Sequence, residues 1–357
     1  MADDRTRVTE LATALGTLGD REVGAALDRR PSELRVDARV WDQLVALHAG
    51  GGLAVEFATA FANGRALLEA RDGLRGRPPL LVEWTGGRRP PGDEVAPIDL
   101  RIDHVYLVSC KYESDILANT SPARLFDGLL ATSGAWDRGD WYGRVAPAAF
   151  QALYEGCRAA VGLTDLPDTP GACTREQQVR LGKALAGRSF PDGGTRAAYA
   201  ELCRQVSEVS AGRWEARLEA GGAARDVMLW RLLRIGSAPY FVLGIDRRTG
   251  EPARYRIASP WDWRDEFELT GFEVTPGRAG QPRVDWRCDV WRRRDRDDRW
   301  TVTGHIEIRW SHGRFAQPPE AKVYLDTPMD RLPGYHRLDE TTRPQLRLWQ
   351  TVTDTGP

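Results

Sequence analysis

The sequence predicts a mixed α/β protein in which an α/β core follows a helical cap and precedes a β-rich domain. Apolar spacing typical of helices covers residues 8–50 and much of 145–220. Two apolar runs joined by a tight-turn signal fill residues 95–112, and the apolar period becomes two after residue 225. The chain of 357 residues is long enough for two or three packed units. We therefore expect a helical cap at residues 1–49, an α/β core at 50–165, a helical connector at 166–224 and a β-rich C-terminal domain at 225–357.

Composition and cysteine usage are typical of a globular protein in a reducing compartment. Hydrophobic residues make up 41% of the chain and charged residues 28%, and the net charge of −1 means that any nucleic-acid surface must be local. The five cysteines are scattered, odd in number and without a C-x-x-C pair, which predicts reduced thiols and a cytoplasmic location. No apolar run approaches the ~18 residues of a spanning helix, and the acidic N-terminus lacks the apolar stretch of a signal peptide, so no membrane partner is expected.

Helical segments are predicted ahead of the first core strand. Thr9 is the expected N-cap of the first helix, and Pro31-Ser32-Glu33-Leu34 is expected to open the second. Gly50-Gly51-Gly52 ends that pattern, because glycine breaks helices. Helical spacing then resumes from Leu53 to Arg71, with Glu56 near the start of this segment.

A β-hairpin is predicted between residues 95 and 112, after a first core strand at residues 78–85. Asp103-His104 suits the tight turn that joins the two strands of the hairpin. Asp99 lies in the first of these strands and Lys111 near the end of the second. The hairpin therefore brings a carboxylate and an ammonium group close together on neighbouring strands.

Pro97-Ile98-Asp99 and Ser109-Cys110-Lys111 resemble the two halves of the motif of the PD-(D/E)xK nuclease superfamily, an Asp on one strand and an acid-x-Lys on the next. The surrounding sequence is most similar to the Mrr-type branch, in which Gln often stands where this chain has Ser109. The resemblance covers roughly residues 50–130 and implies a restriction-endonuclease-like α/β core. It also implies an endonuclease that hydrolyses DNA phosphodiesters with Mg²⁺ or Mn²⁺, in bacterial restriction, antiviral defence or repair.

The resemblance implies a role for each residue of the motif. Asp99 and the backbone carbonyl of Cys110 would bind the metal ion, since hard oxygen ligands suit Mg²⁺. Lys111 would orient the attacking water or help to deprotonate it.

A second carboxylate is expected from elsewhere, because Ser109 stands at a catalytic position that a carboxylate often holds. Asp127 and Glu113 are the alternatives in the sequence that follows the hairpin, and their spacing does not choose between them. In this superfamily the helix before the first core strand often supplies a further metal-binding Glu, and Glu56 stands at the expected place. The alternative for Glu56 is an ordinary solvent-facing carboxylate.

Lysine is rare in this chain, which makes the lysine of the motif informative. Of the 50 basic residues only Lys111, Lys183 and Lys322 are lysine, and all the others are arginine. A compact ammonium group orients a water or neutralises a phosphate oxygen differently from a planar guanidinium group. The alternative for Lys111 is a strand-end side chain that faces solvent.

A second acid-x-Lys sequence, Glu320-Ala321-Lys322, is predicted to lie on a strand. No Pro-x-Asp strand precedes it at hairpin distance. We therefore expect Glu320 and Lys322 to face solvent or to contact DNA.

Two further segments near the hairpin are candidates for phosphate binding. Arg88 and Arg89 lie in a loop rich in glycine and proline, where they would contact phosphates or simply be solvated. Ser121 and Pro122 have the chemistry of a helix start, and Arg124 follows in the first turn. Because helix N-termini favour anions, this turn is a second candidate phosphate contact.

The β-rich domain is predicted to be an antiparallel sheet with one buried face. Residues 281–315 hold nine Arg against six acids, and alternation places Arg287 and Arg309 on the face opposite the tryptophans. Most of these tryptophans are expected in the core. The two arginines would contact DNA phosphates, and the domain would hold the substrate or a partner protein.

Other chemistries find no support in the sequence. The five histidines are unclustered, and neither a Walker-type loop nor a G-x-G-x-x-G loop is present, so a nucleotide cofactor is not indicated. Two alternatives to a nuclease stay open, a catalytically inactive nuclease-fold module that binds DNA or a partner, and a structural or regulatory partner protein. The sequence also leaves open a homo-oligomer.

Overall fold

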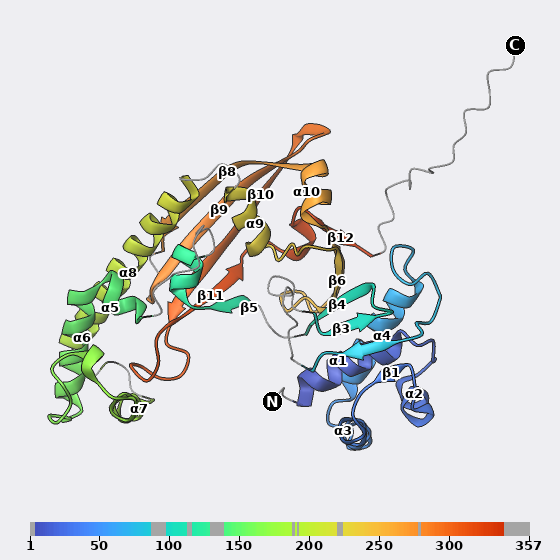
Figure 1. Ribbon diagram of the computed structural model, residues 1–357, viewed down its shortest axis with the longest axis horizontal. Coiled ribbons are helices and arrows are strands. Elements are labelled where there is room, and N and C mark those ends of the chain that lie inside the picture. Colours follow the sequence, from blue (N-terminus) through green and yellow to red (C-terminus); the bar gives the residue numbers. More distant parts are fainter. Residues whose placement is uncertain are drawn as a thin grey trace, which may run out of the picture. The chain divides into compact units, whose positions relative to one another are not determined.

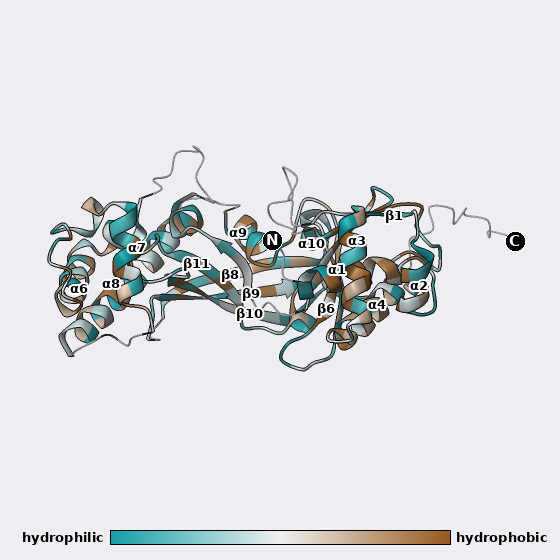
Figure 2. Ribbon diagram, turned by 90° about the horizontal axis from the view of Figure 1, so that it is seen from below, coloured by the Kyte–Doolittle hydropathy of each residue, from teal (hydrophilic) through white to brown (hydrophobic). Residues whose placement is uncertain are grey.

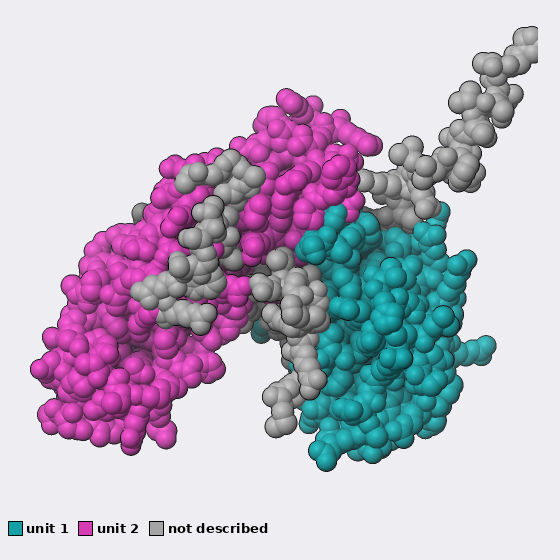
Figure 3. All heavy atoms as spheres, in the orientation of Figure 1, with its two compact units in different colours: residues 1–113, 236–259, 334–357 teal, residues 114–235, 260–333 magenta. Residues whose placement is uncertain are grey.

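The computed structural model describes residues 4–86, 98–112, 116–128, 139–187, 190, 193–219, 224–277 and 280–338. The chain forms two compact units, each built from segments that are distant in sequence (Figure 3). Unit 1 contains residues 1–113, 236–259 and 334–357, and unit 2 contains residues 114–235 and 260–333.

Unit 1 is a mixed sheet with helices (Figure 1). Its helices are α1 (Asp4–Gly16), α2 (Val23–Arg29), α3 (Ala38–Ala49) and α4 (Ala54–Glu69). Its strands are β1 (Leu34–Arg35), β2 (Val82–Trp84), β3 (Leu100–Ile102), β4 (Tyr106–Lys111), β6 (Tyr240–Ile245), β7 (Pro252–Ile257) and β12 (Tyr335–Arg337). They form a seven-stranded sheet in the order β1-β2-β3-β4-β6-β7-β12.

The centre of this sheet is an antiparallel meander of β2, β3 and β4 that continues into a parallel neighbour, β6. The turn between β3 and β4 has positive φ at Asp103 (49°) and His104 (60°), as the two central residues of a type I′ turn require. The side chain of Asp103 also accepts hydrogen bonds from the backbone N–H groups of Leu80 and Leu81, at 2.9 Å each. The predicted hairpin is confirmed.

The helices α1 and α4 cross with their backbones almost in contact. A Cβ atom on Gly64 would lie 2.0 Å from the carbonyl oxygen of Thr13, and one on Gly16 would lie 2.1 Å from that of Phe61. Leu11 and the side chain of Phe61 are buried in the same hydrophobic core as the sheet residues. Only glycine allows two helices to approach this closely.

Two local predictions for the N-terminal region are wrong. Helix α1 begins at Asp4, and Thr9 lies inside it with its hydroxyl donating to the carbonyl of Arg5, so Thr9 is not the N-cap. The second helix does not open at residues 31–34. Leu34 instead pairs with Val82 in the parallel strands β1 and β2, because sheet pairing overrides the local helix-start signal.

Unit 2 joins helices to a second sheet. Its helical segments are the π-helical turn Arg124–Gly128, α5 (Trp141–Val145), α6 (Pro147–Ala160), the 3₁₀ turn Pro170–Ala172, α7 (Arg175–Ala184), α8 (Gly193–Glu219), α9 (Ala224–Leu232), α10 (Pro260–Glu266) and the 3₁₀ turn Met329–Arg331. Its strands are β5 (Ile116–Thr120), β8 (Phe267–Pro276), β9 (Arg283–Arg292), β10 (Asp295–Arg309) and β11 (Glu320–Leu325). The sheet is antiparallel, in the order β5-β11-β10-β9-β8.

One face of this second sheet is apolar and packs against the long helix α8. The alternate residues of β9 from Val284 to Val290 are buried, as are Val302, Ile306 and Ile308 of β10. Trp214 of α8 is fully buried in this layer. Figure 2 shows that these strands carry both hydrophilic and hydrophobic residues. The predicted antiparallel sheet with one buried face is confirmed.

The compact units divide the chain differently from the predicted boundaries. Residues 4–49 share a core with the hairpin rather than forming a separate cap, and the predicted core of 50–165 is divided between the units. Strand β5 belongs to the sheet of unit 2, whereas β6 and β7 belong to that of unit 1. These differences come from pairings between strands that are distant in sequence, which local apolar patterns do not reveal.

Among the helices that the structure describes, no single one is long and apolar enough to cross a membrane. Helices α3 and α4 have the necessary length and composition only when taken together, as a pair bent by 118°.

The close crossing of α1 and α4 leads to a stability prediction. Gly64→Ala is expected to lower the free energy of unfolding by roughly 2–4 kcal/mol, because the added methyl group meets the backbone of α1 and the helices must separate. The matched control is Gly212→Ala in α8, where a Cβ atom meets nothing within 4 Å. That substitution is expected to stabilise α8 by about 0.5–1 kcal/mol. Urea unfolding followed by circular dichroism measures both, and an unchanged midpoint for Gly64→Ala would contradict the prediction.

Candidate active site

The two halves of the motif meet at one end of the hairpin. The register that pairs Leu100 with Val108 places Asp99 beside Ser109 and Cys110. The Asp99 carboxylate oxygen Oδ2 accepts a hydrogen bond from the backbone N–H of Cys110 at 2.6 Å and one from the Ser109 hydroxyl at 3.4 Å. Because side chains alternate along a strand, Ser109 and Lys111 project from the same face of β4.

A helix contributes a further acid, Glu10 of α1, which the sequence did not predict. Glu10 is 7% exposed, and its Oε2 accepts a hydrogen bond from the indole N–H of Trp84 at 2.6 Å. Burial and, to a smaller extent, the charge of Asp99 raise the pKa of Glu10, while the Trp84 hydrogen bond and the charge of Lys111 lower it, which leaves the pKa at about 7. Glu10, Asp99 and Lys111 therefore lie close enough to interact electrostatically.

The thiol of Cys110 faces the same helix. Burial raises the pKa of this thiol well above its ordinary value, the charges of Asp99 and Glu10 raise it further, and a hydrogen bond with Thr13 lowers it. A thiol that stays protonated is a poor nucleophile. The part of Cys110 that concerns the site is its backbone, whose N–H orients Asp99, and the metal-binding role of its carbonyl stays a prediction.

Glu56, the acid predicted for the helix position, makes a different contact. It lies in the first turn of α4, and its Oε1 pairs with the guanidinium of Arg5 at 3.0 Å. Glu56 thus joins α4 to α1 at the surface, whereas Glu10 is the helix acid that interacts with Asp99 and Lys111. The sequence signal at Glu10 is the set of polar side chains, Thr9, Glu10 and Thr13, in a part of α1, residues 8–16, whose other residues are apolar.

The other two candidates for a second carboxylate are Asp127 and Glu113. Asp127 lies in unit 2, where its Oδ2 pairs with Arg144 and with Arg213, the latter at 3.1 Å. A carboxylate held by two guanidinium groups is typical of a structural ion pair. Glu113 lies outside the described residues.

The donor atoms of the cluster are compatible with a hard divalent cation. Within the described ranges no group of three His, Cys, Asp and Glu side chains lies close enough to hold a metal. Mg²⁺, however, is usually bound by one or two carboxylates and keeps several waters. The charge of Asp99 raises the pKa of Glu10, so the two carboxylates repel each other. A divalent cation between them would relieve that repulsion.

The arginines predicted to contact phosphates lie in several places. Arg88 and Arg89 are outside the described residues. In unit 2 the backbone N–H of Arg124 donates to the Ser121 hydroxyl at 3.2 Å, as expected for a helix start, although the turn that follows is a short π-helical one.

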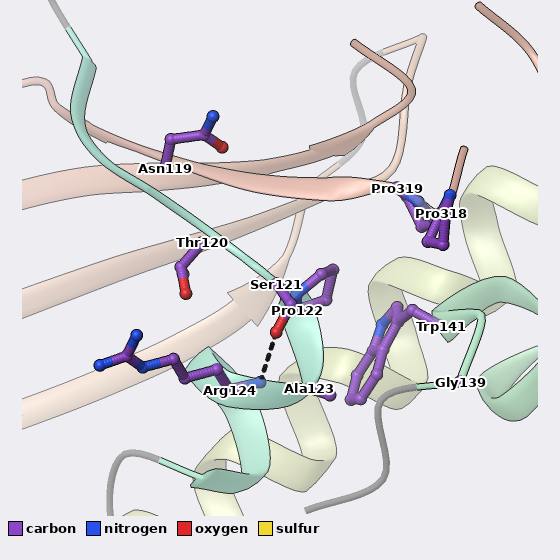
Figure 4. A pocket seen from close by; sticks show the side chains of 10 residues that line it. All are labelled: Asn119, Thr120, Ser121, Pro122, Ala123, Arg124, Gly139, Trp141, Pro318 and Pro319. Carbon is purple, nitrogen blue, oxygen red and sulfur yellow. Dashed lines mark hydrogen bonds between the residues drawn. The ribbon is translucent and has the colours of Figure 1, made fainter. Parts of the chain in front are cut away.

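Arg124 also borders a pocket of about 530 Å³ in unit 2. In Figure 4 its side chain extends away from Trp141 and from the two prolines on the opposite side. The pocket is lined by Asn119, Thr120, Ser121, Pro122, Ala123, Arg124, Gly139, Trp141, Pro318 and Pro319.

Arg287 and Arg309 lie on the polar face of the unit 2 sheet, as predicted, and both are paired there. Arg287 binds Asp289 at 3.0 Å, and Arg309 binds Glu307 at 3.0 Å. These acids weaken the positive field that the arginine count implies. The second acid-x-Lys sequence lies on β11. The Nζ atom of Lys322 lies 3.8 Å from Oε2 of Glu320, and the backbone of Lys322 is in register with Glu307 of β10.

Comparisons of the chain with models of protein families, with curated proteins and with solved structures found no match.

The buried acid leads to a prediction about the pH dependence of stability. A carboxyl group whose pKa rises from 4.5 in the unfolded chain to about 7 in the folded one stabilises the fold below pH 4.5, and this contribution is lost as the pH rises through 7. Glu10→Gln removes that loss and keeps an acceptor for Trp84. In EDTA at pH 8 the free energy of unfolding of the variant is expected to exceed that of the native chain by on the order of 2–3 kcal/mol. At pH 4 the two free energies should be nearly equal.

The control for this prediction is Glu69→Gln, which changes an exposed carboxylate paired with Arg65 and is expected to shift stability by less than ~1 kcal/mol at either pH. Asp99→Asn removes a charge that raises the pKa of Glu10, so it should reduce the pH-dependent loss. Urea unfolding at a series of pH values measures all three. Parallel profiles for the native chain and Glu10→Gln would show that Glu10 titrates normally.

Proposed function

We propose that unit 1 carries a metal-dependent nuclease site of the PD-(D/E)xK kind, which hydrolyses DNA phosphodiesters with Mg²⁺ or Mn²⁺. The observation that carries this proposal is the register of the hairpin, in which the Asp99 carboxylate accepts hydrogen bonds from the Ser109 hydroxyl and the Cys110 N–H, directly before Lys111. The two halves of the motif thus lie together on one hairpin, and Glu10 of α1 interacts electrostatically with Asp99 and Lys111. Burying charged groups together is costly, and such clusters occur preferentially at functional sites.

The residues around the cluster have distinct tasks in this proposal. Asp99, Glu10 and the carbonyl of Cys110 would hold the cation, which when bound lowers the pKa of a water and neutralises charge on the phosphate. The Cys110 N–H and the Ser109 hydroxyl hold the Asp99 carboxylate in one orientation. Ser109 thus serves as a support for Asp99 instead of a ligand. Lys111 orients the attacking water or donates to a phosphate oxygen.

Unit 2 would supply the contacts that hold DNA. Its sheet presents Arg287 and Arg309 on the polar face, and Arg124 borders the pocket beside β5. Each guanidinium has hydrogen atoms left to bind a phosphate even while it is paired with an acid, because it carries five donors. A cytoplasmic enzyme of restriction, antiviral defence or repair is the role that fits these expectations.

A second candidate is a nuclease-fold module that binds DNA or a partner protein without cleaving it. The observation that favours it is Ser109, which stands on β4 in place of a carboxylate and leaves the strand with one metal-binding side chain fewer. The cleavage experiment separates the two candidates.

Cleavage of supercoiled plasmid in Mg²⁺, Mn²⁺ or EDTA tests the proposed activity. Lys111→Ala and Asp99→Asn are each expected to reduce the rate by at least ~100-fold without unfolding the chain, since one removes the amine and the other a ligand charge. The control is Lys183→Ala, which removes an exposed lysine from helix α7 of unit 2 and should keep the native rate. Binding of DNA without cleavage in either metal would favour the inactive module.

The role of unit 2 has its own test. Arg287→Glu with Arg309→Glu is expected to weaken DNA binding and to lower the log–log slope of affinity against salt by about two, because each of the two arginines would bind one phosphate. The control is Arg204→Glu, an arginine of α8 that is paired with Glu201 and Glu208. Fluorescence anisotropy at several salt concentrations measures the slopes, and equal slopes for both variants would assign the sheet a role other than DNA binding.

A further inference from the structure

A buried amide lies beside the candidate site and touches none of its charged groups directly. Asn63 of α4 is 0% exposed. Its side chain makes hydrogen bonds to β6, to β7 and to the residue that follows β4. Its Nδ2 donates to the carbonyl of Gly244 at 2.9 Å and to the Tyr112 hydroxyl at 3.1 Å, and its Oδ1 accepts from Arg254 Nε at 2.8 Å.

We propose that Asn63 is a positioning residue that holds the end of β4, and with it Lys111, against β6 and α1. The catalytic purpose of this positioning rests on the proposed function, whereas the positioning itself is a property of the fold. Three features support it: the close approach of β4 to β6, the direction of the hydrogen bonds, and the energetics of a buried amide.

The end of β4 lies unusually close to β6. Lys111 is the last residue of β4 and pairs in register with Gly244 of β6. A Cβ atom on Gly244 would lie 1.7 Å from the carbonyl oxygen of Lys111, so only glycine permits this approach. Asn63 binds the carbonyl of that same glycine. Asn63 thus binds β6 beside Lys111, the residue at which β4 ends.

The hydrogen bonds around Tyr112 run in one direction. The Thr13 hydroxyl donates to the carbonyl of Thr9 at 2.7 Å, so it accepts from the Tyr112 hydroxyl, 2.8 Å away. The Tyr112 hydroxyl in turn accepts from Asn63. Burial raises the pKa of Tyr112, so the phenol stays neutral and keeps its proton to donate. The chain of hydrogen bonds therefore has a single arrangement that links α4, β4 and α1.

These hydrogen bonds reach the element that carries the other acid. Thr13 lies three residues after Glu10, about one helical turn along α1. The residue that follows Lys111 is thereby bonded to the helix that supplies Glu10. A fixed distance between Lys111 and the two carboxylates requires such a connection, because a misplacement of ~1 Å can cost about 100-fold in rate.

A buried amide is a poor choice for stability alone. Its polar atoms lose hydration on folding, and apolar side chains of similar volume would often stabilise the core as well or better. A fully bonded polar group instead selects one geometry, because every alternative leaves donors or acceptors without a partner. Arg254 donates to the amide oxygen of Asn63 and so fixes the orientation of the amide group.

The test uses conservative variants of the whole chain. Tyr112→Phe removes one oxygen atom, Asn63→Ala removes the amide, and Thr13→Ser keeps the hydroxyl that Tyr112 binds. At a temperature at which all variants are folded, kcat for plasmid cleavage is expected to fall about 10-fold for Tyr112→Phe and more for Asn63→Ala, with KM for DNA within about 2-fold. Thr13→Ser should retain native kcat. The matched control is Tyr142→Phe in unit 2, whose buried hydroxyl donates to the carbonyl of Ile308 at 2.7 Å.

A second readout does not depend on activity. Because the chain has only three lysines, reductive ¹³C-methylation labels Lys111, Lys183, Lys322 and the N-terminal amine and gives few NMR signals, and single Lys→Arg variants assign those of the lysines. The Lys111 signal is expected to shift or broaden in Tyr112→Phe and Asn63→Ala and to stay unchanged in Tyr142→Phe. An unchanged Lys111 signal together with native kcat in both variants would overturn the proposal.

The two readouts separate the failure of this inference from that of the proposed function. If the native chain cleaves no DNA, the proposed activity fails, and the Lys111 signal alone decides whether Asn63 holds the strand end. If the chain cleaves DNA and the variants lose only thermal stability, with kcat and the Lys111 signal unchanged, Asn63 is a structural residue and the inference fails.

Discussion

The close contact between α1 and α4 is the constraint on which the candidate site depends. Gly16 and Gly64 let the two backbones meet, and this brings the polar residues of α1 over the end of the hairpin. Glu10 then lies near Asp99, and Thr13 lies within reach of Tyr112. Any larger side chain at the crossing would move α1 outward and carry the acid away from β4. The packing of two glycines thus determines how strongly Glu10 interacts with Asp99.

The cluster itself is a compromise between charge and burial. In a medium of low polarity the charged form of a carboxyl group is disfavoured, and a neighbouring negative charge disfavours it further. Glu10 experiences both effects, whereas Asp99 is held by the N–H of Cys110 and by Ser109. Two carboxylates in different environments can differ in protonation at the same pH. The amine of Lys111 partly offsets the negative charge of the pair.

Local features of the fold were predictable from the sequence, and long-range ones were not. The hairpin that holds Asp99 and Lys111 depends on a turn signal between two short strands, so its register follows from neighbouring residues. Glu10 escaped prediction because its proximity to Asp99 depends on how a distant helix packs. The face occupied by Arg287 followed from alternation, but its pairing with Asp289, two residues along the same strand, depends on side-chain conformation. Pairing of β4 with β6 joins segments separated by much of unit 2.

That pairing has a consequence for how the protein is made. As the chain leaves the ribosome, β4 is complete long before β6 is synthesised. One edge of the central meander therefore stays unpaired while strand β5 and the helices of residues 114–235 emerge. An open strand edge is a template for pairing with other chains. The backbone of Lys111 finds its partner Gly244 only after that delay. The time for which the edge is exposed is therefore set by the synthesis of the residues between β4 and β6, and slow translation of that stretch would favour aggregation.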